Sequence, residues 1–220
     1  MPGVADADDR DPDPCLGRVF NQSLRIDKRK RVASAVVYLE DIYVGREGVL
    51  DNNNYNSVLQ TGGSLRMADC QFHPHVQIVS PLGAQLRLVN RHQRARAWRL
   101  LSDKKLDVTM TVGAGAMRKM ALSEVAFVEI RDERISANAW VVVAGHPYYT
   151  LTDDDGEFAL HNVPAGKYNL VVWHEPVAMR WRGGKLVYTR ATEYRQRIEV
   201  KAGKQKKPLT LSIKLPQAKN

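Results

Sequence analysis

The side chains best suited to chemistry in this sequence are histidines and cysteines in its first half. His73 and His75 flank Pro74, with Cys70 just before them and His92 further along. Imidazole and thiolate are ligands that copper and zinc accept in proteins. Two histidines at i and i+2 share one face of a strand, but Cys70 falls on the other parity and proline removes a ladder donor. We therefore predict hydrogen-bonded structural histidines; the alternative is a copper-binding or redox site formed by His73 and His75.

The sequence offers little else for catalysis. No nucleophile, base and orienting group occur in a recognisable series, and the zinc-ligand spacing H-x-x-E is absent. The acidic run at 153–156 ends in a glycine and lacks the alternating ligands and distal glutamate of an EF-hand loop, so it predicts a hairpin turn. We expect no enzyme activity and no cofactor.

The chain has two cysteines, Cys15 and Cys70. If they are paired, they close a long loop and contribute about 4 kcal/mol on the chain-entropy account of disulfides. Two buried free thiols in a reducing compartment are the alternative that the residues alone leave open.

Charge is the strongest feature of the composition. The 220 residues carry a net charge of +9, with an acidic start and strongly basic stretches at 87–105 and 195–219. Such a balance favours acidic partners, namely nucleic acid, anionic lipid, polyanionic glycan or an acidic protein. The motifs of nucleic-acid recognition are missing, so we do not expect nucleic acid. A solvated basic face is the simplest interpretation of the charge runs.

Strand patterns dominate the chain and must position these residues. Helices are expected to be short or absent, because no window keeps an apolar period of 3.6 residues. No apolar run approaches the roughly 20 residues of a membrane-spanning helix. Short strands at regular spacing predict β-sandwiches. The patterns predict strands at 35–39, 76–79, 85–89, 106–110, 125–130, 140–143, 148–152, 167–173, 192–200 and 210–215.

The second half of the chain carries motifs of a known family. The series T-D-D-D-G-E-F at 152–158, V-P-A-G-K-Y at 163–168 and W-H-E at 173–175 resembles the carboxypeptidase regulatory-like (transthyretin-like) β-sandwich module. The closest resemblance is to the version fused behind a plastocyanin-like domain in exported bacterial proteins. Upstream segments fit the same two-part pattern, at 15–17, 35–42, 70–76 and Asn90.

The resemblance implies a disulfide between Cys15 and Cys70 that ties the N-terminal segment to the first sandwich. It also implies a periplasmic or extracellular protein. The acidic start lacks the basic and apolar regions of a signal peptide. Because the resemblance implies an exported protein, we expect that a signal peptide was removed. The implied fold class is all-β with tandem β-sandwiches: an acidic, disordered segment at 1–14, a cupredoxin-like sandwich at 15–140, a carboxypeptidase regulatory-like sandwich at 141–215 and a tail at 216–220.

In that family a blue-copper site uses histidine, cysteine, histidine and methionine, the last three in a C-x-x-H-x-x-M loop. On this chain the loop falls on 131–137, with Arg131, Arg134 and Ala137 at the ligand positions and Arg96 near the first histidine. A guanidinium group has no lone pair to give to a metal. The resemblance therefore implies a cupredoxin scaffold whose copper ligands are lost.

Arg96, Arg131 and Arg134 become candidate residues for binding an anion or a partner. If the fold brings them together, the cations point into solvent, hold an external anion or a partner's carboxylates, or pair internally with the nearby acids Glu129, Asp132 and Glu133. We expect a non-enzymatic binding or structural subunit that docks a protein complex or a glycan through sheet edges and basic loops. The glycan enters because transthyretin-like modules share a carbohydrate-binding-like fold.

Overall fold

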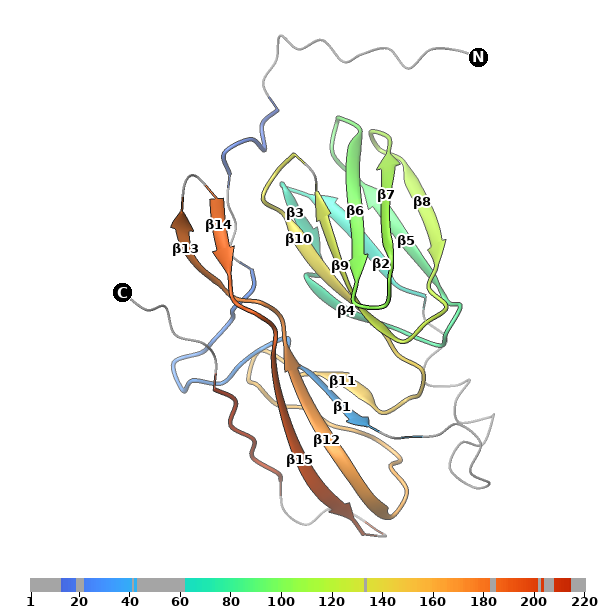
Figure 1. Cartoon of the computed structure of the whole chain (residues 1–220), viewed down its shortest axis with the longest axis vertical. Coiled ribbons are helices and arrows are strands. Elements are labelled where there is room, and N and C mark those ends of the chain that lie inside the picture. The colour runs from blue at the N-terminus through green and yellow to red at the C-terminus, as the bar shows by residue number, and fades with distance from the viewer. Residues whose placement is uncertain are drawn as a thin grey trace. The chain divides into compact units, whose positions relative to one another are not determined.

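The computed structural model describes residues 13–18, 22–40, 42, 62–132, 134–182, 185–201, 203 and 208–214. These residues form strands, turns and irregular segments without any α-helix (Figure 1). Accordingly, none of them lies in a helix long and apolar enough to span a membrane. The predicted fold class, all-β with tandem β-sandwiches, is confirmed. Glu133, residues 1–12 and the expected tail at 216–220 lie outside the described residues.

The strands belong to two compact units that are interleaved in the sequence. Unit 1 combines residues 13–18 with 62–143, and unit 2 combines 22–40 and Ile42 with the described part of 144–214. This grouping differs from the contiguous division expected at 140/141. The reason is that β1 (Val36–Glu40) pairs with β11 (Tyr149–Leu151) and β12 (Gly166–His174).

Unit 1 is a sandwich of two sheets that share one core. The strand β10 runs parallel to β4, and β2 runs parallel to β5. The first sheet has the order β4-β10-β9-β6-β7, with bounds Val76–Val79, Asn138–Val143, Ala126–Asp132, Arg96–Ser102 and Asp107–Val112. The second has the order β3-β2-β5-β8, with bounds Gln71–His73, Ser64–Ala68, Gln85–Asn90 and Met117–Ala121.

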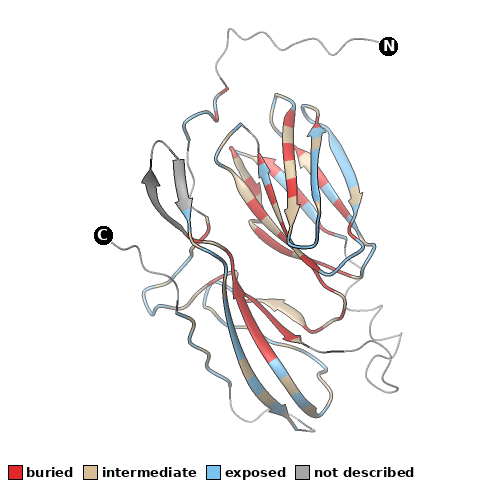
Figure 2. Cartoon of the chain, in the orientation of Figure 1, coloured by how far each residue is buried: buried red, intermediate tan, exposed pale blue. Residues whose placement is uncertain are grey.

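Alternation along the strands of unit 1 decides which polar side chains reach its interior. Buried residues alternate with more exposed ones along β9 and β6 (Figure 2). The pattern of β9 buries Asp132 and exposes Arg131, and the pattern of β6 buries Arg96 and Trp98. Trp98 packs edge-on against Phe72 of the other sheet, with ring centroids 5.2 Å apart. An arginine and an aspartate therefore lie in the same interior as the aromatic core.

Unit 2 is built on a sheet with the order β11-β1-β12-β15, where β15 spans Thr192–Val200. Its central strand β1 is buried over VVYL because strands cover both of its edges and the core covers its face. A separate hairpin is formed by β13 (Ala178–Arg182) and β14 (Lys185–Tyr188).

One predicted strand of unit 2 is wrong. Residues 208–214, which include most of the strand expected at 210–215, are irregular. Leu211 and Ile213 nevertheless pack against the core of this unit. Their alternation reflects contact of one side of an extended segment with the core, not pairing in a sheet.

A turn forms at 153–156, as the sequence predicts. The Asp153 carboxylate accepts the backbone N–H groups of Asp155 and Glu157 at 2.9 and 2.8 Å, and Gly156 adopts a φ of 69°. Such an Asx turn needs a residue without a Cβ at the left-handed position. The neighbouring carboxylates form ion pairs within unit 2, Asp154 with Arg25 and Asp155 with Arg31.

Candidate functional site

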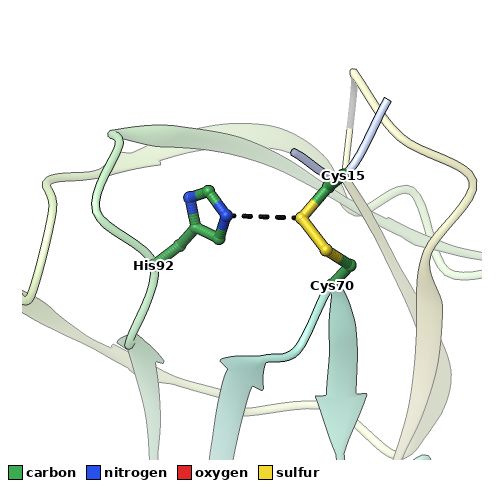
Figure 3. Close-up of side chains that lie close together, drawn as sticks. All are labelled: Cys15, Cys70 and His92. Carbon is green, nitrogen blue, oxygen red and sulfur yellow. Dashed lines mark hydrogen bonds between the residues drawn. A yellow bond between two sulfur atoms is a disulfide. The ribbon is translucent and has the colours of Figure 1, made fainter. Parts of the chain in front are cut away.

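The best-defined polar site lies in unit 1, around a disulfide between Cys15 and Cys70 (Figure 3). The bond is the one that the family resemblance implied, and it joins residues 55 positions apart. Cys70 lies in the turn between β2 and β3, so the bond holds the segment 13–18 against that turn. Both cysteines are buried.

Beside the disulfide, Asp13 and Arg96 form a buried ion pair. Arg96 Nη1 lies 2.7 Å from Asp13 Oδ2, Nη2 donates to Asp13 Oδ1 at 2.8 Å, and both side chains are 1% exposed. Asp13 was expected to belong to a disordered segment at 1–14, but its carboxylate is fixed by this pair and by the Cys15 N–H at 3.0 Å. The interior arginine is thus neutralised by a residue 83 positions away.

The local groups decide the charge state of Asp13. Burial alone raises the pKa of a carboxyl, but here the Cys15 N–H, the Arg96 hydrogen bond and the Arg96 charge outweigh it and lower the pKa of Asp13. The carboxylate is therefore ionised at neutral pH, and Arg96 keeps its countercharge.

Asp132 completes the surroundings of Arg96. Its Oδ1 lies 3.9 Å from Arg96 Nη1 and accepts the backbone N–H groups of Arg134 and Ile135 at 2.9 and 3.2 Å. Its Oδ2 accepts the indole N–H of Trp98 at 3.2 Å. These bonds hold a second carboxylate close to the guanidinium, so the interior charge is shared between two acids.

His92 joins the disulfide to the ion pair. Its Nε2 lies 3.3 Å from Cys15 Sγ (Figure 3). Arg96 Nη2 lies 3.3 Å from each ring nitrogen, so the guanidinium packs against the ring. Burial and the Arg96 charge lower the pKa of His92, which keeps the imidazole neutral at neutral pH. Asn90, itself fully buried, anchors this loop by accepting the His92 backbone N–H at 2.9 Å.

The structure does not bring Arg96, Arg131 and Arg134 together. Arg131 lies on the outer face of β9, its side chain is 56% exposed, and it pairs with Glu129 at 2.7 Å. Arg134 is exposed in the turn that follows β9. Because successive residues of a strand point to opposite faces, an inward Asp132 forces Arg131 outward.

The residues at the expected copper-ligand positions do not fit a copper ion. Arg96 is engaged with Asp13, Arg131 with Glu129, and Ala137 offers only a carbonyl, which accepts the Asp132 N–H at 3.0 Å. Guanidinium groups supply hydrogen-bond donors and no lone pair. We derive no chemistry through copper at these positions.

His73 and His75 lie apart from the disulfide cluster. His73 ends β3 opposite Arg66, and the His75 ring contacts the Asn138 carbonyl at 3.1 Å. Within the part of the chain that the structure describes, one group of three His, Cys, Asp or Glu side chains is close enough to hold a metal ion, and it is Cys15, Cys70 and His92. His73 and His75 thus have no third ligand of these types there.

The outer face of the sheet β3-β2-β5-β8 carries exposed cations. Arg66 in β2 and Arg87 in β5 alternate with buried residues, and Lys119 is exposed on β8. Arg87 lies directly opposite Lys119, and no described carboxylate pairs with any of the three. None of these four strands contains an Asp or Glu. We call Arg66, Arg87 and Lys119 the cationic face.

The sequence alone places the two arginines of the cationic face on the outward side of their strands. The runs L-R-M at 65–67 and L-R-L at 86–88 alternate apolar with cationic residues, which places the arginines on the outward side of two strands. What the alternation does not reveal is that β2, β5 and β8 are neighbours.

Comparison with known proteins gives matches to structures alone. No protein-family model and no curated protein matches the chain. A Cu(I) form of an amicyanin mutant is 11% identical and covers 49% of this chain and 98% of that chain, with a TM-score of 0.34. The copper-containing nitrite reductase of Thermus scotoductus is 12% identical and covers 47% of this chain and 25% of that chain, with the same TM-score. Both of these matches extend over about half of the chain.

Proposed function

We propose that this protein is a non-enzymatic binding subunit that docks an acidic partner protein through the cationic face of unit 1. The observation that carries the proposal is the set of three exposed cations on a sheet face without acids. Like charges directly opposite on neighbouring strands destabilise a sheet, by up to about 1 kcal/mol for a pair such as Arg87 and Lys119. Carboxylates of a partner turn that cost into attraction, and arginine can bind them with two parallel hydrogen bonds.

We infer that unit 1 is a cupredoxin-like unit whose copper ligands have been replaced, with Asp13 and Arg96 in its interior. We infer that unit 2 is a carboxypeptidase regulatory-like unit. A disulfide is typical of oxidising compartments, which supports a periplasmic or extracellular location. A polyanionic glycan is the other class of ligand that this face can attract.

The test compares two charge-reversed variants in capture from a native cell-envelope extract. R87E/K119E alters the cationic face, and K104E/K105E makes the same change in charge in the exposed turn between β6 and β7. We expect the wild type and K104E/K105E to retain one acidic partner protein, and R87E/K119E to lose it. The association is expected to slow steeply as salt concentration rises.

Equal retention by both variants, or binding that salt does not affect, contradicts the proposal. Capture that survives protease treatment of the extract but not glycosidase treatment assigns the face to a glycan instead.

A further inference from the structure

The disulfide and His92 place three potential metal ligands in one small volume. One ligand atom each of Cys15, Cys70 and His92 lies within 4.8 Å of the other two (Figure 3). Cys15 and Cys70 are 0% and 6% exposed, and His92 is half-buried. Two sulfurs and one imidazole are the donors of a common zinc site, in which water or a fourth side chain completes a tetrahedron.

We propose that reduction of the Cys15–Cys70 disulfide converts this cluster into a Zn²⁺ site with two thiolate ligands and His92. The inference is independent of the partner-binding role, because it uses none of the residues of the cationic face.

The conversion balances with a dithiol as the reductant. A thiolate of the dithiol attacks one sulfur, the S–S bond breaks, and a mixed disulfide forms. The second thiol then displaces the remaining protein thiol, which leaves two protein thiols and an oxidised, cyclic disulfide. Zn²⁺ replaces the two thiol protons, which go to solvent, and His92 Nε2 donates a lone pair without losing a proton.

Charge favours a divalent ion at this position. Arg96, Asp13 and Asp132 already form an internal set with one net negative charge, and two thiolates add two more. Zn²⁺ cancels the charge of both thiolates, so the buried groups return to the single net negative charge that they have when the disulfide is intact. Cu⁺, the other ion that accepts this donor set, leaves one additional buried negative charge.

The ligands are held by contacts other than the S–S bond. The Asp13–Arg96 pair and the turn bonds Leu16 N–H to Asp13 O (2.9 Å) and Arg18 N–H to Cys15 O (3.2 Å) fix the segment that carries Cys15. Asn90 holds the His92 backbone. Reduction therefore leaves the two thiols and the imidazole close to one another.

The test is titration of the anaerobic, phosphine-reduced full-length protein with Co²⁺, a spectroscopic substitute for zinc. We expect one Co²⁺ per chain, with thiolate-to-cobalt charge-transfer absorption and the visible bands of a tetrahedral ion, both removed by Zn²⁺. The oxidised protein is expected to show neither. H92A is expected to weaken Co²⁺ binding at least about tenfold, whereas H161A, which removes an exposed histidine of unit 2, leaves it unchanged.

Thiol counting must give two free thiols in the reduced wild type and in H92A, which separates loss of the imidazole from incomplete reduction. Absence of tetrahedral Co²⁺ bands in the reduced wild type overturns the proposal. Equal affinity of H92A and the wild type for Co²⁺ also overturns the proposal. This holds even if reduction unfolds unit 1, because an unfolded chain does not position the imidazole and the two proteins would then bind alike. A preference for Cu⁺ over Zn²⁺ in a competition with chelators contradicts the charge argument.

Discussion

The pairing of Asp13 with Arg96 is the most consequential contact between single residues in unit 1. A guanidinium that is 1% exposed has lost its hydration, and its two nearest carboxylates, on Asp13 and Asp132, replace the water. Removing one partner of such a pair leaves a charge without compensation, which costs more than the pair contributes when intact. The stability of unit 1 should therefore depend strongly on Asp13, although that residue precedes every strand that the structure describes.

We predict that D13N lowers the free energy of unfolding of unit 1 by about 3 kcal/mol, because the amide cannot neutralise Arg96. Urea unfolding measures the change. The control is D107N, which removes an exposed partner of Arg99 (side chains 43% and 55% exposed) and should cost less than about 1 kcal/mol. An equal effect of the two substitutions contradicts the importance of the buried pair.

A single buried residue of unit 2, His146, makes the stability of that unit depend on pH. Its Nδ1 accepts the Tyr148 N–H at 3.2 Å, and burial lowers the pKa of the imidazole from 6.5 to about 4. Because the unfolded state binds the proton more readily, the stability from this group is complete above about pH 6.5 and is lost as pH falls toward 4.

Linkage predicts that the free energy of unfolding of the wild type falls by about 2 kcal/mol between about pH 7 and pH 5 through this residue. In H146N, an amide oxygen can accept the same N–H and does not titrate, so this part of the pH dependence should vanish. Parallel urea titrations of both proteins at the two pH values measure it. Identical pH profiles of the two proteins would show that folding does not lower the pKa of His146, which contradicts the prediction.

Individual strands were largely predictable, and their partners were not. The strands near 85–89, 125–130 and 140–143 follow from alternation and β-branched composition, which are local properties. Pairing of β1 with β11 and β12 joins segments about a hundred residues apart, and no local pattern encodes it. The same limit applies to the site: the sequence singled out Arg96 as a candidate residue, but no local pattern reveals that Asp13 is its partner.

Gly63 tests the packing where β2 begins. A Cβ at this position lies 2.5 Å from Val79 Cγ2 and 3.0 Å from Leu86 Cδ1, and both neighbours are fully buried. We expect G63A to destabilise unit 1 by about 1–3 kcal/mol through overpacking. At Gly113 the nearest atom is Ala116 Cβ at 3.6 Å, so G113A should be neutral or slightly stabilising. Thermal unfolding compares the two, and similar melting temperatures contradict the tight contact.

At the scale of the whole molecule, the interleaving of the units links distant positions. A substitution early in the chain should unfold strands near its C-terminal end. Val37 lies at the centre of β1 and is 0% exposed. V37D places an unpaired charge in the core of unit 2. The free-energy cost of burying that charge exceeds the free energy of unfolding of a marginally stable unit.

Hydrogen exchange with mass spectrometry gives the measurement for V37D. Amides of β12 and β15 are expected to lose protection, while those of β9 and β10 in unit 1 keep it. Loss of protection in β10 with retention in β12 contradicts the assignment of β1 to unit 2.

The interleaved order of the units also determines the order in which paired strands leave the ribosome. Among the strands that the structure describes, β1 emerges from the ribosome first, but β11 and β12 follow only after the described strands of unit 1 have been made. Unit 1 can therefore finish folding while the apolar run VVYL still waits for its neighbours. Fast translation of the remaining C-terminal residues shortens the time in which this apolar stretch is exposed to aggregation.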